Sequence, residues 1–420
     1  MAFVQTVVAE ANAATTQGGG GNYVFETNAG VLYLVYIDSA LDVVFSKSTD
    51  GGKTWSAGTA VFTGSAVQVS AWFDRHSGIS GGLIHCAYAE SATDDVFYRS
   101  IDTANADSLS SQTTIFAGAS TAGTTSSISI ARTRGGNLLC VGTFDGGTES
   151  WAKKSTNVGA NWGDISSPME GAANDTILLA PGFAADNQDA LAIFWDSDAS
   201  EVSRKIYDDS GDSWAETSIA GTMTTLTPGT AFPNMAIAPD LANSQLVMVV
   251  WSANDLANAD LRCFTITESA ITETANNVIQ NSSDDQSLCA ISIDTTNNDW
   301  YAFYCGITGG TQTAQTFLSV CYKVSTDDGA TWGSEQRLSG VNPQVVWLIT
   351  NPRMVYLSAE VNAAIFSTAT PNSIHFMSIM PTLPPVADVE TGVQYGINGV
   401  EYTGTLSGGG GGSIFKGGIY

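Results

Sequence analysis

The sequence predicts an all-β protein, a β-propeller of about seven four-stranded blades, with six blades as the alternative. Apolar strand-like runs recur about every 50 residues, among them VLYLVYI at 31–37, LIHCAYA at 83–89 and NLLCVGTF at 137–144. A polar turn and a second strand-like run follow each of them. A period of this length is typical of repeat folds. Nearly unbroken apolar runs indicate strands buried on both faces, as in radially packed sheets.

The composition also favours many short strands and turns. Glycine contributes 43 of 420 residues, and charged residues make up only 13%, against about 25% in an average globular protein. With 15 basic and 41 acidic residues, the formal net charge is −26. Nucleic acids and anionic membranes attract clustered Lys and Arg, so neither is expected as a partner. Neutral ligands such as sugars are compatible with this charge.

Targeting and cysteine chemistry give three further expectations. No apolar run reaches 18 residues, which predicts no membrane insertion. Residues 1–21, MAFVQTVVAEANAATTQGGGG, contain no Lys or Arg, so they make a poor signal for Sec secretion. The six cysteines lie mostly in apolar runs without metal-binding spacing. We expect buried free thiols, although an even count also permits disulfides.

One motif, Ser-x-Asp-x-Gly-x-Thr-Trp, returns with the repeat. The two close copies contain Ser48, Asp50, Gly52 and Trp55, and Ser325, Asp327, Gly329 and Trp332. The two degenerate copies contain Ser155, Asn157, Gly159 and Trp162, and Tyr207, Asp209, Gly211, Ser213 and Trp214. A catalytic residue is normally needed once, so the repetition favours a structural element.

Each copy is expected in the hairpin between the third and fourth strands of a blade. There the Asp carboxylate can accept hydrogen bonds from backbone N–H groups a few residues on. The glycine permits a positive φ, and the tryptophan can pack between sheets. These hairpins lie at the rim of a propeller, remote from the central axis.

The repeated motif resembles the Asp-box, or BNR repeat, of sialidase-like β-propellers, over residues 22–380. This resemblance implies the fold more than an activity, because such boxes also occur in non-enzymatic propellers. A sialidase would need three arginines that clamp a carboxylate, a Tyr–Glu nucleophile, an Asp acid/base and an early Arg-Ile-Pro motif. The chain has no Arg-Ile-Pro and no arginine before Arg75. Only Arg353, near Tyr356, resembles a late sialidase arginine, so no catalytic residue is assigned.

Other candidate chemistry is weak. The histidines His76, His85 and His375 are scattered, and His85 is expected to be a satisfied core residue. Paired acids are expected in solvated turns, with Ca²⁺ binding or a glycosidase pair as alternatives: Asp94–Asp95, Asp196 and Asp198, Asp208–Asp209, and Asp284–Asp285. Five aromatic residues are expected either to pack in the core or to stack on sugars: Trp72, Phe73, Trp251, Trp300 and Trp347. No cofactor is expected apart from that Ca²⁺.

A second resemblance lies at the ends of the chain. MAFVQTVVAEANAAT and VADVETGVQYGINGVEYTGTL resemble the termini of bacteriophage tail-associated and other virion proteins. We therefore expect an N-terminal arm at 1–21, or a strand that closes the ring, followed by the propeller at 22–380. Residues 381–420 would form a proline linker, a small hairpin module and a glycine-rich docking tail or disordered end. The anchors of that tail would be Ile414, Phe415, Ile419 and Tyr420.

These resemblances imply a structural or receptor-binding protein of a bacteriophage virion, such as a tail fibre, appendage or surface protein. Host surface glycans are the candidate ligands. Other virion proteins would be partners through both terminal segments, and a homo-oligomer is expected. The protein would act in the virion after assembly in the host cytoplasm. The alternatives are a glycoside hydrolase or sialidase-like enzyme on the same fold, and a cellular lectin or adhesin.

Overall fold

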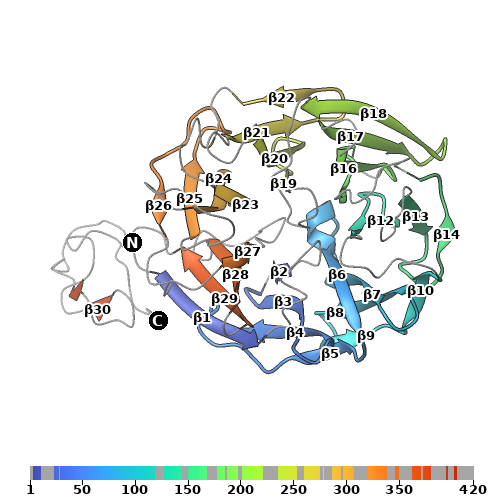
Figure 1. The fold of residues 1–420 in the computed structure, drawn as a ribbon, viewed down its shortest axis with the longest axis horizontal. Coiled ribbons are helices and arrows are strands. Elements are labelled where there is room, and N and C mark those ends of the chain that lie inside the picture. Colours follow the sequence, from blue (N-terminus) through green and yellow to red (C-terminus); the bar gives the residue numbers. More distant parts are fainter. Residues whose placement is uncertain are drawn as a thin grey trace.

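The computed structural model describes strands, turns and one short helix. The described residues are 3–10, 23–27, 29–118, 127–143, 150–167, 177–184, 187–196, 201–220, 235–252, 260–274, 278, 286–294, 297–306, 320–337, 346–349, 362–369, 372–379, 394–395 and 402–403. Within them, the backbone forms six four-stranded sheets, one five-stranded sheet and one two-stranded sheet. The first seven sheets stand around a common axis as blades (Figure 1). The predicted all-β propeller with about seven blades is confirmed.

Blades 1 to 3 follow the chain, and their strands pair in sequence order from the axis to the rim. Blade 1 comprises β2 (Tyr23–Glu26), β3 (Leu32–Ile37), β4 (Val43–Ser48) and β5 (Thr59–Phe62). Blade 2 comprises β6 (Ala66–Phe73), β7 (Leu83–Glu90), β8 (Asp95–Asp102) and β10 (Thr113–Phe116), with β9 (Ser108–Leu109) also beside β8. Blade 3 comprises β11 (Ile128–Arg132), β12 (Leu138–Thr143), β13 (Ser150–Ser155) and β14 (Gly163–Asp164).

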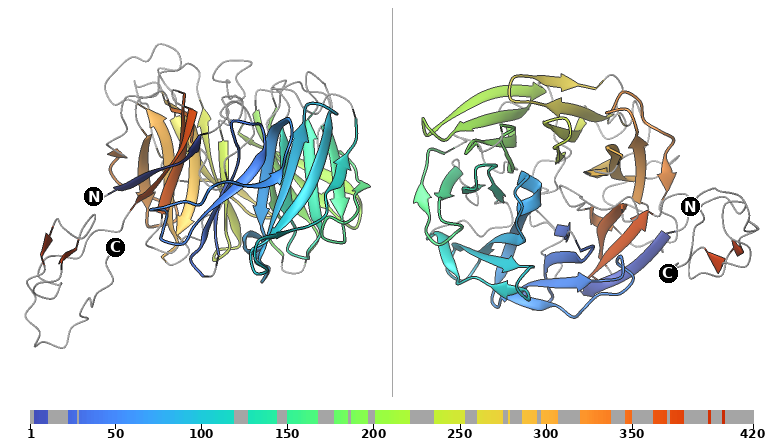
Figure 2. Two further views of the ribbon diagram at one scale, coloured as in Figure 1. Left: turned by 90° about the horizontal axis from the view of Figure 1, so that it is seen from below. Right: turned by 180° about the vertical axis from the view of Figure 1, so that it is seen from behind.

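Blades 4 to 6 repeat this order. Blade 4 comprises β15 (Ile177–Pro181), β16 (Ala190–Asp196), β17 (Glu201–Asp208) and β18 (Ser213–Ala220). Blade 5 comprises β19 (Met235–Asp240), β20 (Gln245–Ser252), β21 (Asp260–Ile266) and β22 (Ile271–Glu273). Blade 6 comprises β23 (Gln286–Asp294), β24 (Asp299–Gly306), β25 (Val320–Ser325) and β26 (Gln336–Arg337). The side view in Figure 2 shows these sheets standing roughly along the axis.

Blade 7 is closed by the N-terminal strand. Its order from the rim is β1 (Phe3–Glu10), β29 (Asn372–Ile379), β28 (Asn362–Ala369) and β27 (Val346–Ile349). Phe3 lies opposite Ile379, and Glu10 lies opposite Ser373. Of the two possibilities for the first residues, the ring-closing strand is therefore what the structure shows. Residues 3–10 belong to the propeller rather than to a separate arm.

The closure also explains why the seventh repeat has no Asp-box. In blades 1 to 6 a hairpin joins the third and fourth strands, but in blade 7 these two strands come from opposite ends of the chain. The apolar run MVYLSAE at 354–360 lies outside the described residues. The second strand of blade 7, counted from the axis, is β28, whose sequence includes the run AAIFS. The two-stranded sheet pairs β30 (Gln394–Tyr395) with β31 (Tyr402–Thr403), within the segment where a small hairpin was expected.

The apolar runs form the core because blades cover one another. All six residues of β3 and all six of β19 are buried, which is the pattern of strands covered on both faces. Among the innermost strands, serine hydroxyls add hydrogen bonds between neighbouring blades. The backbone N–H of Ile130 donates to Ser70 Oγ at 3.1 Å, and that of Leu179 donates to Ser129 Oγ at 2.9 Å. Five cysteines are buried free thiols: Cys86, Cys140, Cys263, Cys289 and Cys321.

Candidate functional site

The Asp-box of blade 1 is a hydrogen-bonded turn. Asp50 Oδ1 accepts the backbone N–H of Thr54 at 2.9 Å, and Asp50 Oδ2 accepts its hydroxyl at 2.6 Å. Ser48 Oγ donates to Asp50 Oδ1 at 2.7 Å and accepts the N–H of Gly52 at 2.8 Å. Partial burial raises the pKa of Asp50, but the bonds from Thr54 and Ser48 outweigh it and hold that pKa below its ordinary value. Because this carboxylate is committed to the turn, it is a poor candidate for an acid catalyst.

The copies in blades 3 and 6 repeat this geometry. Asn157 Oδ1 accepts the N–H of Asn161 at 2.9 Å, and Asp327 Oδ1 accepts the N–H of Thr331 at 2.8 Å. In each copy the serine hydroxyl oxygen accepts the backbone N–H of the box glycine, Gly159 or Gly329, at 2.8 Å. The glycine φ values are 89° at Gly52, 84° at Gly159 and 81° at Gly329, a region that L side chains avoid.

The fourth copy, at 207–214, is not an Asp-box, which corrects the sequence prediction. Asp208, not Asp209, accepts the backbone N–H of Ser210 at 2.9 Å and of Gly211 at 3.2 Å. The left-handed residue is Asp212, with φ 45°, and Trp214 lies opposite Tyr207 in a tight hairpin. The physical reason is the replacement of the anchoring serine by Tyr207, whose hydroxyl is too far from its own backbone to accept the glycine N–H.

The box tryptophans pack at the rim, between or beside blades. The ring centroids of Trp55 and Phe376 of blade 7 are 5.3 Å apart, edge to face, and those of Trp162 and Tyr98 of blade 2 are 5.5 Å apart. Trp332 packs on the core shared by blades 5 and 6. These contacts join sheets, as expected for a structural role.

A buried polar cluster lies closer to the axis, between blades 2 and 3. Asp74 is 1% exposed and His85 is 0% exposed. Asp74 Oδ1 contacts His85 Nε2 at 2.9 Å and accepts from Arg132 Nη1 at 2.5 Å. His85 Nδ1 lies 2.7 Å from Tyr98 Oη. The expectation that His85 is a satisfied core residue is confirmed.

The electrostatics of this cluster follow from its burial. Burial raises the pKa of Asp74, but the bonds from His85 and Arg132 outweigh it, so the pKa stays below its ordinary value. Burial lowers the pKa of His85 more than Asp74 raises it, so the imidazole is neutral at pH 7. A neutral ring donates from Nε2 to the carboxylate and accepts the Tyr98 hydroxyl at Nδ1. The cluster joins blade 2 to blade 3 through the hydrogen bond from Arg132 to Asp74.

The segment after β6 extends towards the axis. It begins with the short 3₁₀ helix η2 (Asp74–Ser77), which Figure 1 shows near the centre of the ring. A Cβ atom at Gly78 would lie 3.8 Å from Arg134 of blade 3 and 3.9 Å from Leu241 of blade 5. Since alternate strands run in opposite directions, this turn lies on the same face as the Asp-boxes. We call it the Asp-box face.

Arginines of the described residues bind this chain's own acceptors. Four of them donate to backbone oxygens: Arg75 to Glu26, Arg99 to Val61, Arg134 to Phe183, and Arg204 to Thr267. Two more donate to carboxylates, Arg132 to Asp74 and Arg262 to Glu273. The side chain of Arg337 and the whole of Arg353 lie outside the described residues. Five of these six interactions join neighbouring blades, the exception being Arg262.

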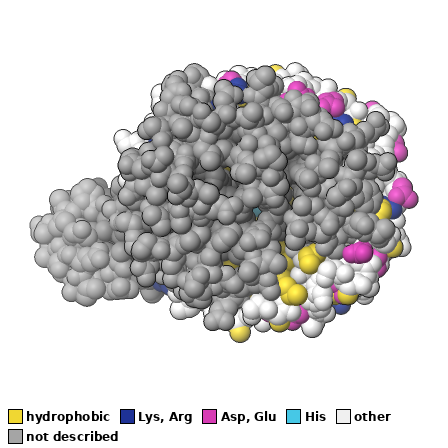
Figure 3. Space-filling model, viewed as in Figure 1, with side chains coloured by type: hydrophobic (Ala, Val, Ile, Leu, Met, Phe, Trp, Pro, Cys, Tyr) yellow, Lys and Arg dark blue, Asp and Glu magenta, His cyan; other side chains and the backbone are white. Residues whose placement is uncertain are grey.

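Cross-strand ion pairs recur on the outer half of three blades, a feature that the sequence analysis missed. Lys153 pairs with Asp164 in blade 3, Lys205 with Glu216 in blade 4, and Arg262 with Glu273 in blade 5. Each cation lies on the third strand and each acid lies eleven positions later, on the fourth strand, so this spacing was the signal that could have found the pairs. Figure 3 shows acidic and basic side chains side by side near the rim.

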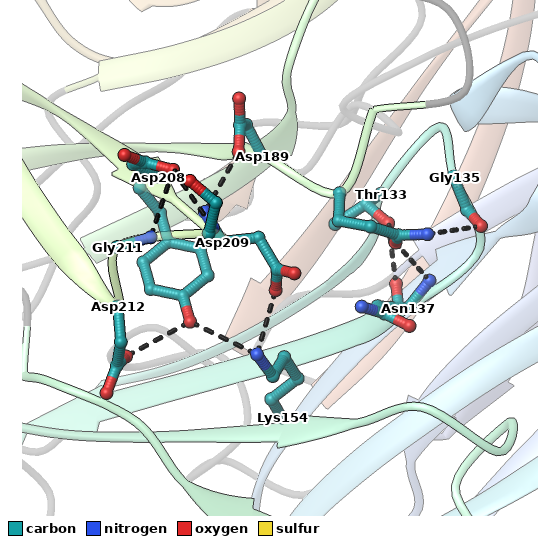
Figure 4. Close-up of polar contacts among 12 residues, drawn as sticks. Thr133, Gly135, Asn137, Lys154, Asp189, Asp208, Asp209, Gly211 and Asp212 are labelled. Atoms are coloured by element: carbon teal, nitrogen blue, oxygen red, sulfur yellow. Dashed lines mark hydrogen bonds and ion pairs between the residues drawn. The ribbon is translucent and has the colours of Figure 1, made fainter.

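Blades 3 and 4 also meet through Lys154 (Figure 4). Lys154 Nζ donates to Asp209 Oδ1 at 2.8 Å and lies 3.4 Å from Tyr207 Oη, which donates to Asp212 Oδ1 at 3.1 Å. Asp189 Oδ1 accepts the backbone N–H of Asp209 at 2.9 Å. Asp209, predicted as a box residue, is therefore an inter-blade anchor.

The remaining candidates are turn or core residues where the structure describes them. Asp95 accepts the backbone N–H of Gly118 at 2.7 Å. In the searched, described part of the chain, no three His, Cys, Asp or Glu side chains come together as a metal site. Trp72, Phe73 and Trp300 are at most 3% exposed, so the sugar-stacking alternative is wrong for them. Outside the described residues or side chains lie Asp198, Asp284, Asp285, Trp251, Trp347, His375 and the tail residues Ile414, Phe415, Ile419 and Tyr420.

Comparisons with known proteins support the fold. No protein-family model and no curated protein matches the sequence. An ulvan lyase, described as polysaccharide lyase PL25, is similar with a TM-score of 0.54 at 9% identity, covering 89% of this chain and 95% of its own. Such a lyase bound to -[GlcA(1-4)Rha3S]- gives a TM-score of 0.53 at 9% identity, over 89% and 95% of the two chains.

A Hadza microbial sialidase is a more distant likeness. Its TM-score is 0.42 at 11% identity, covering 84% of this chain and 64% of the sialidase. At 9% identity, the two lyase structures show a similarity of fold alone. A search of the described residues finds no helix with the length and hydropathy needed to cross a bilayer.

Proposed function

We propose that this chain is a non-catalytic, glycan-binding propeller that forms part of a bacteriophage virion. The observation that carries the first half is the engagement of arginines. Six of them already donate to acceptors of this chain, five between blades, so a carboxylate-clamping triad could not be assembled from them without loosening the ring. The titratable cluster around Asp74 and His85 is buried and hydrogen-bonded, which favours a structural role over chemistry.

Glycan binding is the ligand class that the fold likeness favours, since two similar structures with TM-scores above 0.5 are polysaccharide lyases. A net charge of −26 favours neutral saccharides over polyanions. Because residues 74–82 extend towards the axis on the Asp-box face, we place the ligand on the opposite face. The described turns on that face are 38–42, 63–65 and 91–94, which join strands of blades 1 and 2.

The pairing of β1 with β29 supports attachment through the termini. Because Phe3 lies opposite Ile379, segments that precede β1 and follow β29 leave the propeller at one point on its rim. That point is the open hairpin of blade 7, on the Asp-box face. Docking there to other virion proteins would turn the opposite face outwards, towards host glycans.

The test of ligand class uses the labelled full-length chain on an array of neutral and acidic glycans, together with hydrolase and lyase assays on the same saccharides. Binding to a neutral glycan without turnover supports the proposal. Release of an unsaturated uronate or a free sugar would overturn it in favour of the second candidate, a polysaccharide lyase or hydrolase, which the likeness to the ulvan lyases favours.

The test of attachment compares molar masses by light scattering for residues 1–420 and 1–380. The shorter chain keeps every blade, because all seven sheets lie within residues 3–379. An oligomer that becomes a monomer on truncation supports assembly through the tail. Identical monomers for both chains would refute the tail as an assembly device.

A further inference from the structure

The outer edge of β29 differs from the third-strand edges of the other blades. In blades 1 to 6, the fourth strand is tethered to the third by a hairpin. In blade 7, the fourth strand is β1, which arrives from the far end of the chain. Its connection onward to β2 is residues 11–22, ANAATTQGGGGN.

The closing ladder is long for a fourth strand. β1 has eight residues, and seven of them have register partners in β29. By contrast, β14 and β26 have two residues each, β22 has three, and β5 and β10 have four; only β18 also has eight. A strand that no short hairpin tethers loses more conformational entropy when it becomes ordered. More backbone hydrogen bonds, and so a longer ladder, are needed to offset that loss.

β29 is held in place by contacts that do not involve β1. Ile374 and Phe376 are 0% exposed and pack in a cluster with side chains of blade 1. The Phe376 ring also contacts Trp55 and packs directly on Gly52 of the blade 1 Asp-box. The edge that accepts β1 is therefore pre-organised by its neighbours, as in other sites that bind an added strand.

We propose that this edge is a strand-acceptor site, and that β1 of one copy can occupy the β29 edge of a second copy. The ring-closing strand then also serves as an oligomerisation device. A 12-residue connection can span at most about 40 Å, so it can carry β1 to the rim of an adjacent copy. The same antiparallel pairs form within or between chains, so exchange preserves the register. The inference is independent of any ligand on the opposite face.

Site-specific cross-linking of full-length chains tests the exchange. One chain carries Val4→Cys and a second, of distinguishable mass, carries Ser378→Cys, since Val4 and Ser378 are register partners. Directly opposed Cβ atoms in an antiparallel pair are close enough for a disulfide. After mixing and mild oxidation, we expect a mixed disulfide between the two introduced thiols, located by peptide mass.

The matched control replaces Ser378→Cys by Ser373→Cys, whose partner is Glu10, about 20 Å along the strand from Val4. We expect mixed dimers at least five-fold above this control, and the wild-type chain gives the background from native thiols. Mixed dimers no more frequent than the control would refute exchange. A single chain carrying both Val4→Cys and Ser378→Cys checks the acceptor site itself, and its failure to form an internal disulfide would also refute the proposal.

Discussion

Two regions of this propeller contain an aspartate paired with basic side chains, one buried near the axis and one exposed on the outer strands. Near the axis, Asp74 binds His85 and Arg132 with both partners buried or nearly so, and its side chain is 2% exposed. On the outer strands, Asp164 binds Lys153 with its side chain 86% exposed. A buried pair leaves an uncompensated charge when one member is removed, whereas water replaces the lost partner of an exposed one. We therefore expect the burial of each ion pair to decide how much it contributes to the free energy of unfolding.

The largest expected effect is at Asp74. Replacing Asp74→Ala removes the acceptor of both His85 and Arg132, and we expect a loss of about 3–5 kcal/mol in the free energy of unfolding. Urea denaturation of the two proteins measures it. A loss below about 1 kcal/mol would show that the axis cluster is no more important than a surface pair.

A rim residue should come next, which sharpens the comparison. Gly52→Ala puts a Cβ 2.0 Å from Phe376 at a φ of 89°, so we expect a loss of about 2–3 kcal/mol. Gly211→Ala is the matched control, because that glycine has no positive φ and its Cβ would lie no closer than 3.0 Å to a neighbour, the side chains of Asp208 and Ser213. Urea denaturation measures both losses. Equal losses in the two variants would contradict the conclusion that the blade 1 turn is an Asp-box and the blade 4 turn is not.

The pH dependence tests the axis region without removing an ion pair. Burial, aided by Arg75, lowers the pKa of His76 from 6.5 to about 3. Between these values the unfolded chain binds more protons than the folded chain, so stability falls as the pH falls from 6.5 towards 3. The share from His76 is about 2 kcal/mol at pH 5. His76→Gln should flatten the curve of unfolding free energy in this window, and an unchanged slope would contradict a buried neutral His76.

The smallest effect is expected at the outer ion pair. A double-mutant cycle on Lys153→Ala and Asp164→Ala should give a coupling of about 0.2–1 kcal/mol that shrinks in high salt. A salt-insensitive coupling above about 2 kcal/mol would erase the distinction between the two regions.

Much of the fold was predictable because it rests on local patterns. The period of apolar runs identified repeated sheets, and the Ser-Asp-Gly-Trp spacing located three true box turns, since all their hydrogen bonds lie within five residues. The same spacing wrongly predicted an Asp-box at 207–214. The Asp, Gly and Trp positions match there, but Tyr207 replaces the serine whose oxygen anchors the turn. The exposed roles considered for Trp72 and Trp300 failed because neighbouring blades cover them, and burial by a distant segment leaves no local signal.

By itself, the sequence determined the repeat, the strand order within blades 1 to 6, the box turns and the unfavourable balance of charge for nucleic acids. These properties depend on residues close together in the chain. Tertiary structure alone decided that β1 closes blade 7, that Asp74 meets Arg132, and that arginines are used between blades. Those contacts join segments tens to hundreds of residues apart, and their partners are backbone oxygens or single carboxylates that no residue pattern distinguishes until the ring brings them together.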